Sequence, residues 1–401
     1  MPKRVLVIGD SMSLAHVARA IVVAHRLEEE GAIIVFATGA AHQALARKEN
    51  FDVREVFCVA PEFAHAAIRR GSHIFDYETL KRYVESDLAL FREVQPDLVI
   101  GDMRLSLNIS AELAGIEYWS ILSGYLTRYY NAMQSPPKTF PAMRLLGDRI
   151  SHGIFPFLKS LILRYYAINF RCYRRQLGLD SINDILDVIA SPYRNLIADL
   201  PRFIPCSSLP PHFEYIGPLI WEPNLPDPEW LDRLHSDAPT VYVSMGSTGD
   251  QNDLRRILIC LRDAGWQVMT TTGPHGKAPP GVFAATFARG SSLLRRSQLL
   301  ICHGGSGTIY QAISEGVPII GIATFHDQEI NLERAQALRW GIALDPIDWR
   351  EADLFEAIRC VFTTEYQTAV TNSQSEIRLF IQEAKKKPLL SFYYNRKIEC
   401  K

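Results

Sequence analysis

The chain has 401 residues, with 47% hydrophobic and 22% charged residues and a formal net charge of −1 at pH 7. A chain of this length is longer than a typical domain with a single hydrophobic core, and it suits two domains. The charge balance gives no overall field that would favour nucleic acid, and no apolar run reaches the ~18–20 residues of a membrane-spanning helix. The seven cysteines are scattered, odd in number and without a C-x-x-C pair. They indicate reduced thiols, so we expect a cytoplasmic protein.

Strand and helix patterns alternate through the first part of the chain. A buried strand is predicted at residues 5–8, a helix at 14–30 and a second strand at 33–36, and the alternation continues to residue 122. This pattern is typical of a parallel, doubly wound sheet. Residues 123–176 interrupt it with an aromatic, basic and helical segment. The proline-rich stretch 190–228 is predicted to be an interdomain linker.

A second alternation begins with a strand at residues 240–244 and runs through the strand at 299–302. The predicted fold class is therefore α/β, with two doubly wound, Rossmann-like domains. We expect an N-terminal domain over 1–216, a C-terminal domain over 217–376 and a last helix and tail over 377–401.

The most informative stretch is residues 302–316, which reads C-H-G-G-S-G-T-I-Y-Q-A-I-S-E-G. It follows a buried strand, and its glycines allow a tight turn into a helix. The unpaired N–H groups and the dipole of a helix start favour an anion, and His303 adds a donor at the strand's C-terminal end. Glu315 lies two turns further on, where it could accept hydrogen bonds from a ribose diol.

The run from His303 to Asn331 resembles the nucleotide-sugar signature of the family 1 glycosyltransferases, the UDP-glycosyltransferase-like enzymes of natural-product and macrolide glycosylation. The resemblance extends more weakly over nearly the whole chain. It implies a GT-B architecture, in which two Rossmann-like domains face each other across a cleft. It also implies inverting transfer of a hexose or deoxyhexose from a UDP- or TDP-sugar to a hydroxyl of a small lipophilic acceptor, either a natural product or a lipid.

The resemblance assigns the donor site to the second domain, with Asp327 and Gln328 holding sugar hydroxyls and Glu315 holding the ribose. No Asp-x-Asp pair occurs in the sequence, so we expect neither a metal nor another cofactor, and helix-start donors would stabilise the leaving diphosphate instead. The predicted nucleotide-sugar residues are Gly246, Ser247, His303, Gly305, Ser306, Gly307, Thr308, Glu315, Asp327 and Gln328.

The predicted catalytic base is His16, paired with the carboxylate of Asp102. Both are carried over from the family's His–Asp pair. Both follow strands of one sheet, and a carboxylate beside an imidazole fixes its tautomer and raises its basicity. The sequence departs from the family at residues 287–294, where an aromatic-x-Pro-Gln motif is missing. The choice between uracil and thymine therefore stays open.

The aromatic and basic segment 125–173 is predicted to form the acceptor mouth, through Tyr125, Tyr129, Tyr130 and Phe157. Two alternatives stay open for it: an extra helical layer packed on the sheet, or a face that lies on an anionic membrane at the inner side of the cell. A nonhydrolysing sugar-nucleotide epimerase and a non-catalytic nucleotide-sugar-binding partner protein are the alternative functions. The sequence leaves the sugar, the acceptor and the oligomeric state undetermined.

Overall fold

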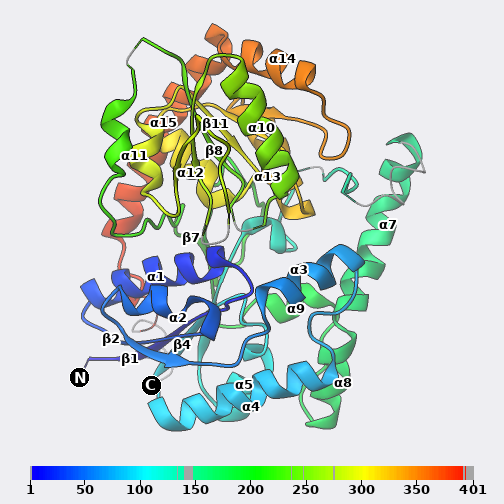
Figure 1. Cartoon of the computed structure of the whole chain (residues 1–401). Helices are drawn as coiled ribbons and strands as arrows, with labels where there is room; N and C mark the ends of the chain where they lie inside the picture. The colour runs from blue at the N-terminus through cyan, green and yellow to red at the C-terminus, as the bar shows by residue number, and fades with distance from the viewer. Residues whose placement is uncertain are drawn as a thin grey trace. The chain divides into compact units, whose positions relative to one another are not determined.

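The computed structural model describes residues 2–132, 134–139, 148–235, 237–246, 248–273, 276–391 and 393. The chain divides into two compact units, which are described separately below (Figure 1). Unit 1 comprises Met1–Met133, Ile154–Trp221 and Ile381–Lys401, and unit 2 comprises Gln134–Gly153 and Glu222–Phe380.

Unit 1 is built on a seven-stranded sheet in the order β3-β2-β1-β4-β5-β6-β7, with every neighbouring pair parallel. Its strands are β1 (Arg4–Gly9), β2 (Ile33–Thr38), β3 (Asp52–Glu55), β4 (Leu98–Asp102), β5 (Tyr118–Leu122), β6 (Arg194–Ile197) and β7 (Phe213–Tyr215). The described residues of the first segment of unit 1, which ends at Met133, form five helices and one 3-10 turn. They are α1 (Leu14–Glu29), α2 (Ala40–Arg47), α3 (Pro61–Arg70), α4 (Tyr77–Val94), α5 (Leu107–Ala114) and η1 (Gly124–Leu126). After unit 2 has contributed Gln134–Gly153, the chain of unit 1 continues with α7 (Asp148–Tyr166), which belongs to unit 1 from Ile154 on, and with α8 (Ile168–Gln176) and α9 (Ile185–Ile189).

Unit 2 carries a six-stranded parallel sheet in the order β10-β9-β8-β11-β12-β13. Its strands are β8 (Thr240–Ser244), β9 (Gln267–Thr271), β10 (Phe283–Ala285), β11 (Leu299–Cys302), β12 (Ile319–Gly321) and β13 (Gly341–Ala343). Its helical elements are η2 (Glu229–Arg233), α10 (Gln251–Asp263), α11 (Gly290–Leu294), α12 (Ser306–Ser314), α13 (His326–Ala337), α14 (Glu351–Val361) and α15 (Thr364–Lys386). Two doubly wound sheets confirm the predicted fold class.

The prediction of a linker over residues 190–228 is wrong for most of its length. β6 and β7 lie within it and extend the sheet of unit 1, with Asn195 paired to Phe213. The prolines that suggested a linker fall in the loops around these short strands, where a missing N–H costs no ladder hydrogen bond. The chain passes into unit 2 only after Trp221.

The C-terminal tail contributes to the core of unit 1. Leu389, Leu390 and Tyr393 are buried in the same cluster as Val5 and Trp119. The carboxylate of Glu30, at the end of α1, accepts hydrogen bonds from the N–H groups of Leu389 and Leu390 at 2.6 and 2.8 Å. The tail therefore completes the hydrophobic core to which the first strand, β1, also contributes.

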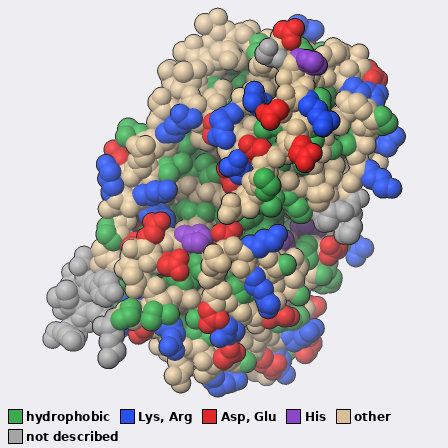
Figure 2. Space-filling view, turned by 60° about the vertical axis from the view of Figure 1, so that its left-hand side comes forward, with side chains coloured by type: hydrophobic (Ala, Val, Ile, Leu, Met, Phe, Trp, Pro, Cys, Tyr) green, Lys and Arg blue, Asp and Glu red, His purple; other side chains and the backbone are tan. Residues whose placement is uncertain are grey.

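Charged side chains of both signs are interspersed over the face drawn in Figure 2, which agrees with the near-zero net charge. Within the described part of the chain, none of the helices is both long enough and apolar enough to span a bilayer.

We predict that Leu389→Ala lowers the free energy of unfolding of unit 1 by about 2–4 kcal/mol, because it leaves a cavity in a closed core. Hydrogen exchange of the β1 amides, read by mass spectrometry, measures this loss in unit 1 alone. Leu379→Ala is the matched control, since Leu379 is 56% exposed on α15. Equal β1 protection in wild type and Leu389→Ala would contradict a structural role for the tail.

Candidate functional site

Each sheet reverses its strand order once, between β1 and β4 in unit 1 and between β8 and β11 in unit 2. Open parallel sheets bind ligands at such points, beyond the carboxyl ends of the strands. His16 follows β1 and Asp102 ends β4, whereas Gly246 follows β8 and His303 follows β11. The predicted residues of each unit are thus brought to its own reversal point.

In unit 1, His16 and Asp102 contact each other, as the sequence predicted. Ser13 caps α1, its Oγ accepting from the N–H of Ala15 at 3.3 Å, and His16 stands in the first turn. The Nδ1 atom of His16 lies 3.0 Å from Oδ1 of Asp102, whose side chain is fully buried. Because Nδ1 faces the carboxylate, Nε2 is the ring nitrogen left to exchange a proton with a substrate.

Arg19 completes this group and was missed by sequence reasoning. Its Nε donates to Oδ2 of Asp102 at 2.7 Å and its Nη2 donates to Oδ1 at 2.6 Å, while Nη1 donates to Oγ of Ser123 at 3.0 Å. Nη2 also lies 3.2 Å from Nδ1 of His16. Arg19 follows His16 by three residues, so the i, i+3 spacing on a helix was the available signal.

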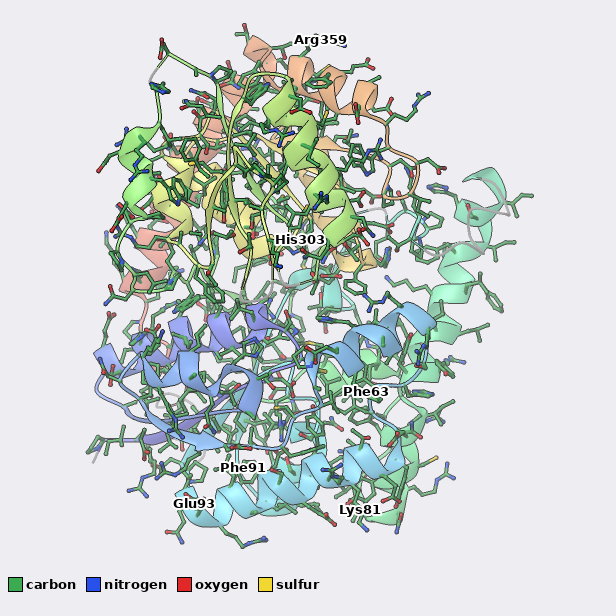
Figure 3. All side chains as sticks on the ribbon, in the orientation of Figure 1. Phe63, Lys81, Phe91, Glu93, His303 and Arg359 are labelled. Atoms are coloured by element: carbon green, nitrogen blue, oxygen red, sulfur yellow. The ribbon has the colours of Figure 1, made fainter. Side chains whose placement is uncertain are left out.

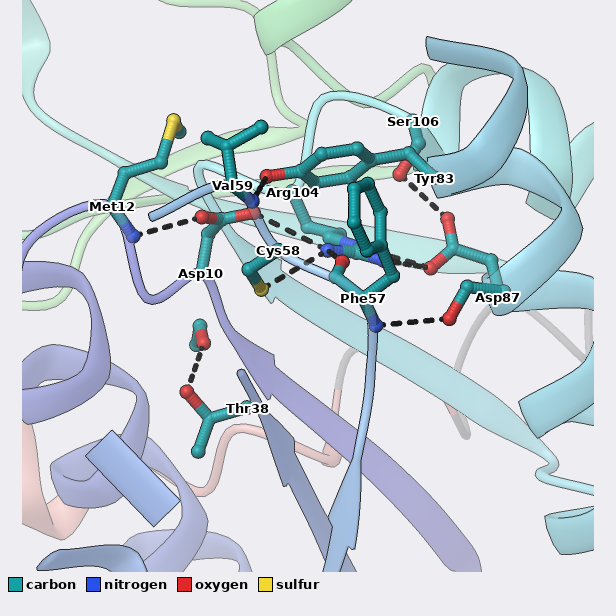
Figure 4. Close-up of polar contacts among 12 residues, drawn as sticks. Asp10, Met12, Thr38, Phe57, Cys58, Val59, Tyr83, Asp87, Arg104 and Ser106 are labelled. Carbon is teal, nitrogen blue, oxygen red and sulfur yellow. Dashed lines mark hydrogen bonds and ion pairs between the residues drawn. The ribbon is translucent and has the colours of Figure 1, made fainter. Parts of the chain in front are cut away.

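A second buried network supports the loop between β1 and α1, just before His16 (Figure 4). Asp10, the first residue after β1, accepts from the N–H of Met12 at 3.0 Å and lies 3.3 Å from Nη1 of Arg104. Arg104 also donates from Nε and Nη2 to Oδ1 of Asp87, at 2.9 and 2.7 Å. Burial raises the pKa of Asp10, and the positive charge of Arg104 opposes that rise. The network fixes the path of the chain from β1 into α1.

The four predicted acceptor residues of unit 1 lie in different environments. Tyr125 is on η1, which follows β5 after one residue. Tyr129 packs edge-on against Phe213 with ring centroids 5.1 Å apart, and it lines a cavity of about 570 Å³. Tyr130 forms an isolated antiparallel bridge with Cys206, and Phe157 stands 70% exposed on α7. The role of the four in acceptor binding stays a prediction.

The predicted anion site of unit 2 is the start of α12, capped by Gly305 and preceded by His303, which Figure 3 labels. The first intrahelical bond runs from Ile309 N–H to the Gly305 carbonyl at 3.0 Å. The N–H groups of Ser306, Gly307 and Thr308 precede that bond, so they have no intrahelical acceptor. Such groups can donate to an anion, and that role stays a prediction for them.

The imidazole of His303 is held between two glycines. A Cβ at Gly246 would lie 2.5 Å from Cε1 of His303, and one at Gly305 would lie 2.9 Å from Nε2. Gly246 also has a positive φ of +58°. Burial lowers the pKa of His303 to about 4, against the opposing effect of the Ser244 backbone. The ring is therefore neutral at pH 7 and can donate one hydrogen bond. The predicted neighbour Ser247 lies outside the described residues.

The two residues predicted to bind the sugar, Asp327 and Gln328, lie in different environments. Asp327 is exposed in the first turn of α13, as a sugar ligand could be. Gln328 is buried: its Oε1 accepts from the N–H groups of Thr324 and Phe325 at 2.7 and 3.2 Å, and its Nε2 donates to Oγ1 of Thr248 at 2.9 Å. Its side chain thus holds the β12–α13 turn in place.

Glu315 caps the far end of α12, nine residues and about 13 Å along the axis from Ser306. Its carboxylate oxygens lie 3.6 Å from Arg295 and 3.6 Å from Arg378. Glu315 thus stands at the far end of the helix from His303, in keeping with its position two turns further on in the sequence, and its role as a ribose ligand stays a prediction. One turn nearer the helix start, Gln311 stands against Gly290, and its Nε2 lies 3.5 Å from Oε1 of Glu222.

The chain is similar to known proteins both in sequence and in fold. Residues 269–379 match the family model described as erythromycin biosynthesis protein CIII-like, C-terminal domain. A PGL/p-HBAD biosynthesis glycosyltransferase of Mycobacterium tuberculosis (strain ATCC 25177 / H37Ra) is 31% identical over 346 residues, covering 85% of this chain and 81% of the relative. A PGL/p-HBAD biosynthesis rhamnosyltransferase of Mycobacterium bovis (strain BCG / Pasteur 1173P2) is also 31% identical over 346 residues, covering 85% of this chain and 77% of the relative.

Among solved structures, the spinosyn rhamnosyltransferase has a TM-score of 0.65 at 17% identity, covering 94% of this chain and 96% of its own. That enzyme has been solved with thymidine diphosphate and with spinosyn aglycone. At this identity the likeness shows the fold, which is the GT-B fold that the sequence resemblance implied.

We predict that the conformational stability of unit 2 falls as the pH drops from about 6.5 to 4. The pKa of His303 is lower in the folded protein than in the unfolded chain, so the unfolded chain binds more protons in this window. The slope should be on the order of 1.4 kcal/mol per pH unit for one group. Hydrogen exchange of the β8 and β11 amides at several pH values measures it.

The matched pair for this test is His303→Gln, which should flatten the slope, and His235→Gln, which changes an exposed histidine of the same unit and should leave it unchanged. If His303→Gln kept the full slope, another group would carry the acid sensitivity.

Proposed function

The chain belongs to family 1 of the glycosyltransferases, and from that membership we propose a specific reaction for it. The proposed reaction is inverting, metal-independent transfer of a hexose, most simply a 6-deoxyhexose such as rhamnose, from a UDP- or TDP-sugar to a hydroxyl of a lipophilic acceptor. The rhamnosyltransferase names of a close relative and of a structural neighbour support the deoxyhexose. The neighbour's complexes with thymidine diphosphate and an aglycone support a TDP-sugar and a lipophilic acceptor.

The observation that carries the proposal is the buried contact between Asp102 and Nδ1 of His16. With Nδ1–H donated to the carboxylate, Nε2 carries a lone pair and takes the proton of the acceptor hydroxyl. The acceptor oxygen then forms a bond to the anomeric carbon as the bond from that carbon to the diphosphate breaks. A single displacement of this kind inverts the anomeric configuration.

In this proposal, unit 2 stabilises the leaving diphosphate. Its departing charge is met by the N–H groups at the start of α12 and by the neutral donor His303. A buried, uncharged donor that is already in place needs no reorganisation when charge develops. This division gives unit 1 the proton transfer and unit 2 the leaving group.

We predict that His16→Ala lowers kcat by about 10²–10⁴, the usual contribution of a general base, while the affinity for the nucleoside diphosphate stays unchanged. Calorimetric titration with TDP and UDP, beside turnover of a TDP- or UDP-sugar, separates the two effects. The control is His25→Ala, because His25 lies on the same helix but bonds to Glu49 at 3.1 Å.

Turnover of His16→Ala within about threefold of wild type would remove His16 as the base. A wild type that binds the diphosphate but never transfers a sugar would instead support the non-catalytic alternative. Assays in excess EDTA complete the test, since a rate that required added magnesium or manganese would contradict the metal-independent part.

Arg19 is a positioning residue, because it donates to both carboxylate oxygens of Asp102. We predict that Arg19→Met lowers kcat while the affinity for TDP stays unchanged, because Asp102 loses two donors and no longer holds the His16 ring in place. Arg19→Lys keeps a donor and should restore kcat in part. Turnover measured beside calorimetric titration with TDP separates the two effects.

Arg26→Met is the matched control, since Arg26 is a buried arginine of the same helix that donates to the Ala384 carbonyl instead. If Arg19 only stabilised the fold, both variants would have a lower folded fraction, and kcat per folded molecule would be the same in each as in wild type.

A further inference from the structure

The helices α7 and α8 carry a row of apolar side chains that the described residues leave partly exposed. Six large side chains of this row are between 40% and 70% exposed. Five of them recur every three or four residues, and the sixth, Ile162, adjoins Leu161. We call them the apolar stripe: Ile154, Phe157, Leu161, Ile162, Tyr165 and Ile168. A surface helix normally turns such a face inward, so an exposed one of this length indicates a binding surface.

The stripe is not simply the outer side of a well-packed layer. The buried residues of α8, Phe170 and Tyr173, already supply contacts to the core of unit 1. Phe170, for example, packs against Phe75 with ring centroids 5.6 Å apart. The stripe therefore adds a second apolar face to helices that are anchored by their first.

Between Asp148 and Asp180 the charged residues of α7 and α8 are all basic. Residues 149–179 contain six arginines and lysines and no aspartate or glutamate. Arg164, Arg171 and Arg175 are exposed, whereas Arg174 is buried and bonds to Glu112 at 2.8 Å. This local excess stands out in a chain whose net charge is −1.

The neighbouring helix α3 continues the same character. His73, just beyond its end, packs on Tyr165 with ring centroids 4.1 Å apart, so the end of α3 lies beside α7 (Figure 1). α3 exposes Phe63 and Ile68, and its last turn carries Arg69 and Arg70. The surface is therefore wider than a single helix.

We infer that α7 and α8 dock this glycosyltransferase on an anionic phospholipid membrane, with the apolar stripe in the interfacial region and the flanking arginines on lipid phosphates. An amphipathic helix with a basic polar side binds in this way, lying in the plane of the interface without crossing it. Charge complementarity decides between occupants: a second copy would bring its own arginines against these, whereas an anionic surface neutralises them. The inference concerns location, and it stands apart from the proposed reaction.

The test is co-sedimentation of the full-length protein with vesicles of phosphatidylcholine alone and of phosphatidylcholine mixed with phosphatidylglycerol. Binding is expected on the mixed vesicles, and it should weaken at high salt. Arg171→Gln and Arg175→Gln should each weaken it about fivefold, the contribution of one basic residue near an anionic surface. Phe157→Ser should weaken it about tenfold, because Phe157 loses its apolar contact.

Each variant has a control on unit 2. Arg359→Gln changes an exposed arginine of α14 (labelled in Figure 3), and Phe362→Ser changes a phenylalanine that is 40% exposed. Neither should alter vesicle binding. The affinity for TDP should be the same in all variants, so a failure of the membrane inference leaves the proposed reaction unaffected.

Three results would overturn the inference. One is the absence of binding to either vesicle type. Another is sedimentation velocity that shows a dimer in wild type and a monomer in Phe157→Ser, which would make the stripe an interface between copies. The last is a raised Michaelis constant for a water-soluble acceptor in Phe157→Ser without vesicles, which would assign the stripe to the acceptor site.

Discussion

The ion pair between Arg19 and Asp102 is the interaction on which the arrangement of unit 1 depends. A carboxylate with no exposed surface has lost its water, and that cost is offset only by partners that stay in place. The fork from Arg19 supplies two of them and His16 a third. Because α1 carries both partners and β4 carries the acid, the same contacts that keep the charge buried also fix where the imidazole stands.

Much of the fold could be predicted because its signals are local. Short apolar runs separated by helical patterns indicate parallel strands, and parallel strands bring their carboxyl ends to one edge. That reasoning was enough to place His16 near Asp102 and His303 near Gly246 before any coordinates were known. It failed at β6 and β7, since three- and four-residue strands between prolines leave too little periodicity to separate from a linker.

The side-chain roles were harder to predict because they depend on what else competes for each group. Gln328 matches a sugar-binding position by its neighbours in sequence, but its amide is engaged by two backbone N–H groups and Thr248. Glu315 is separated from the anion site by the length of α12 and is paired with two arginines. Such competition is set by tertiary contacts. A sequence motif gives the position of a residue on its helix and leaves its partners undetermined.

The two histidines show how one kind of position yields two chemistries. Both follow a strand at the point where strand order reverses, so topology alone would give them the same role. His303 is buried between glycines, with no carboxylate partner among the described residues, and desolvation holds it neutral as a donor. His16 keeps part of its ring exposed and has a carboxylate at Nδ1, which is the arrangement that a proton acceptor needs. Arg19 bonds to both oxygens of the same carboxylate, so Asp102 is itself held in place while it orients the ring. Topology therefore sets where each histidine stands, and the neighbouring side chains set what its ring can do.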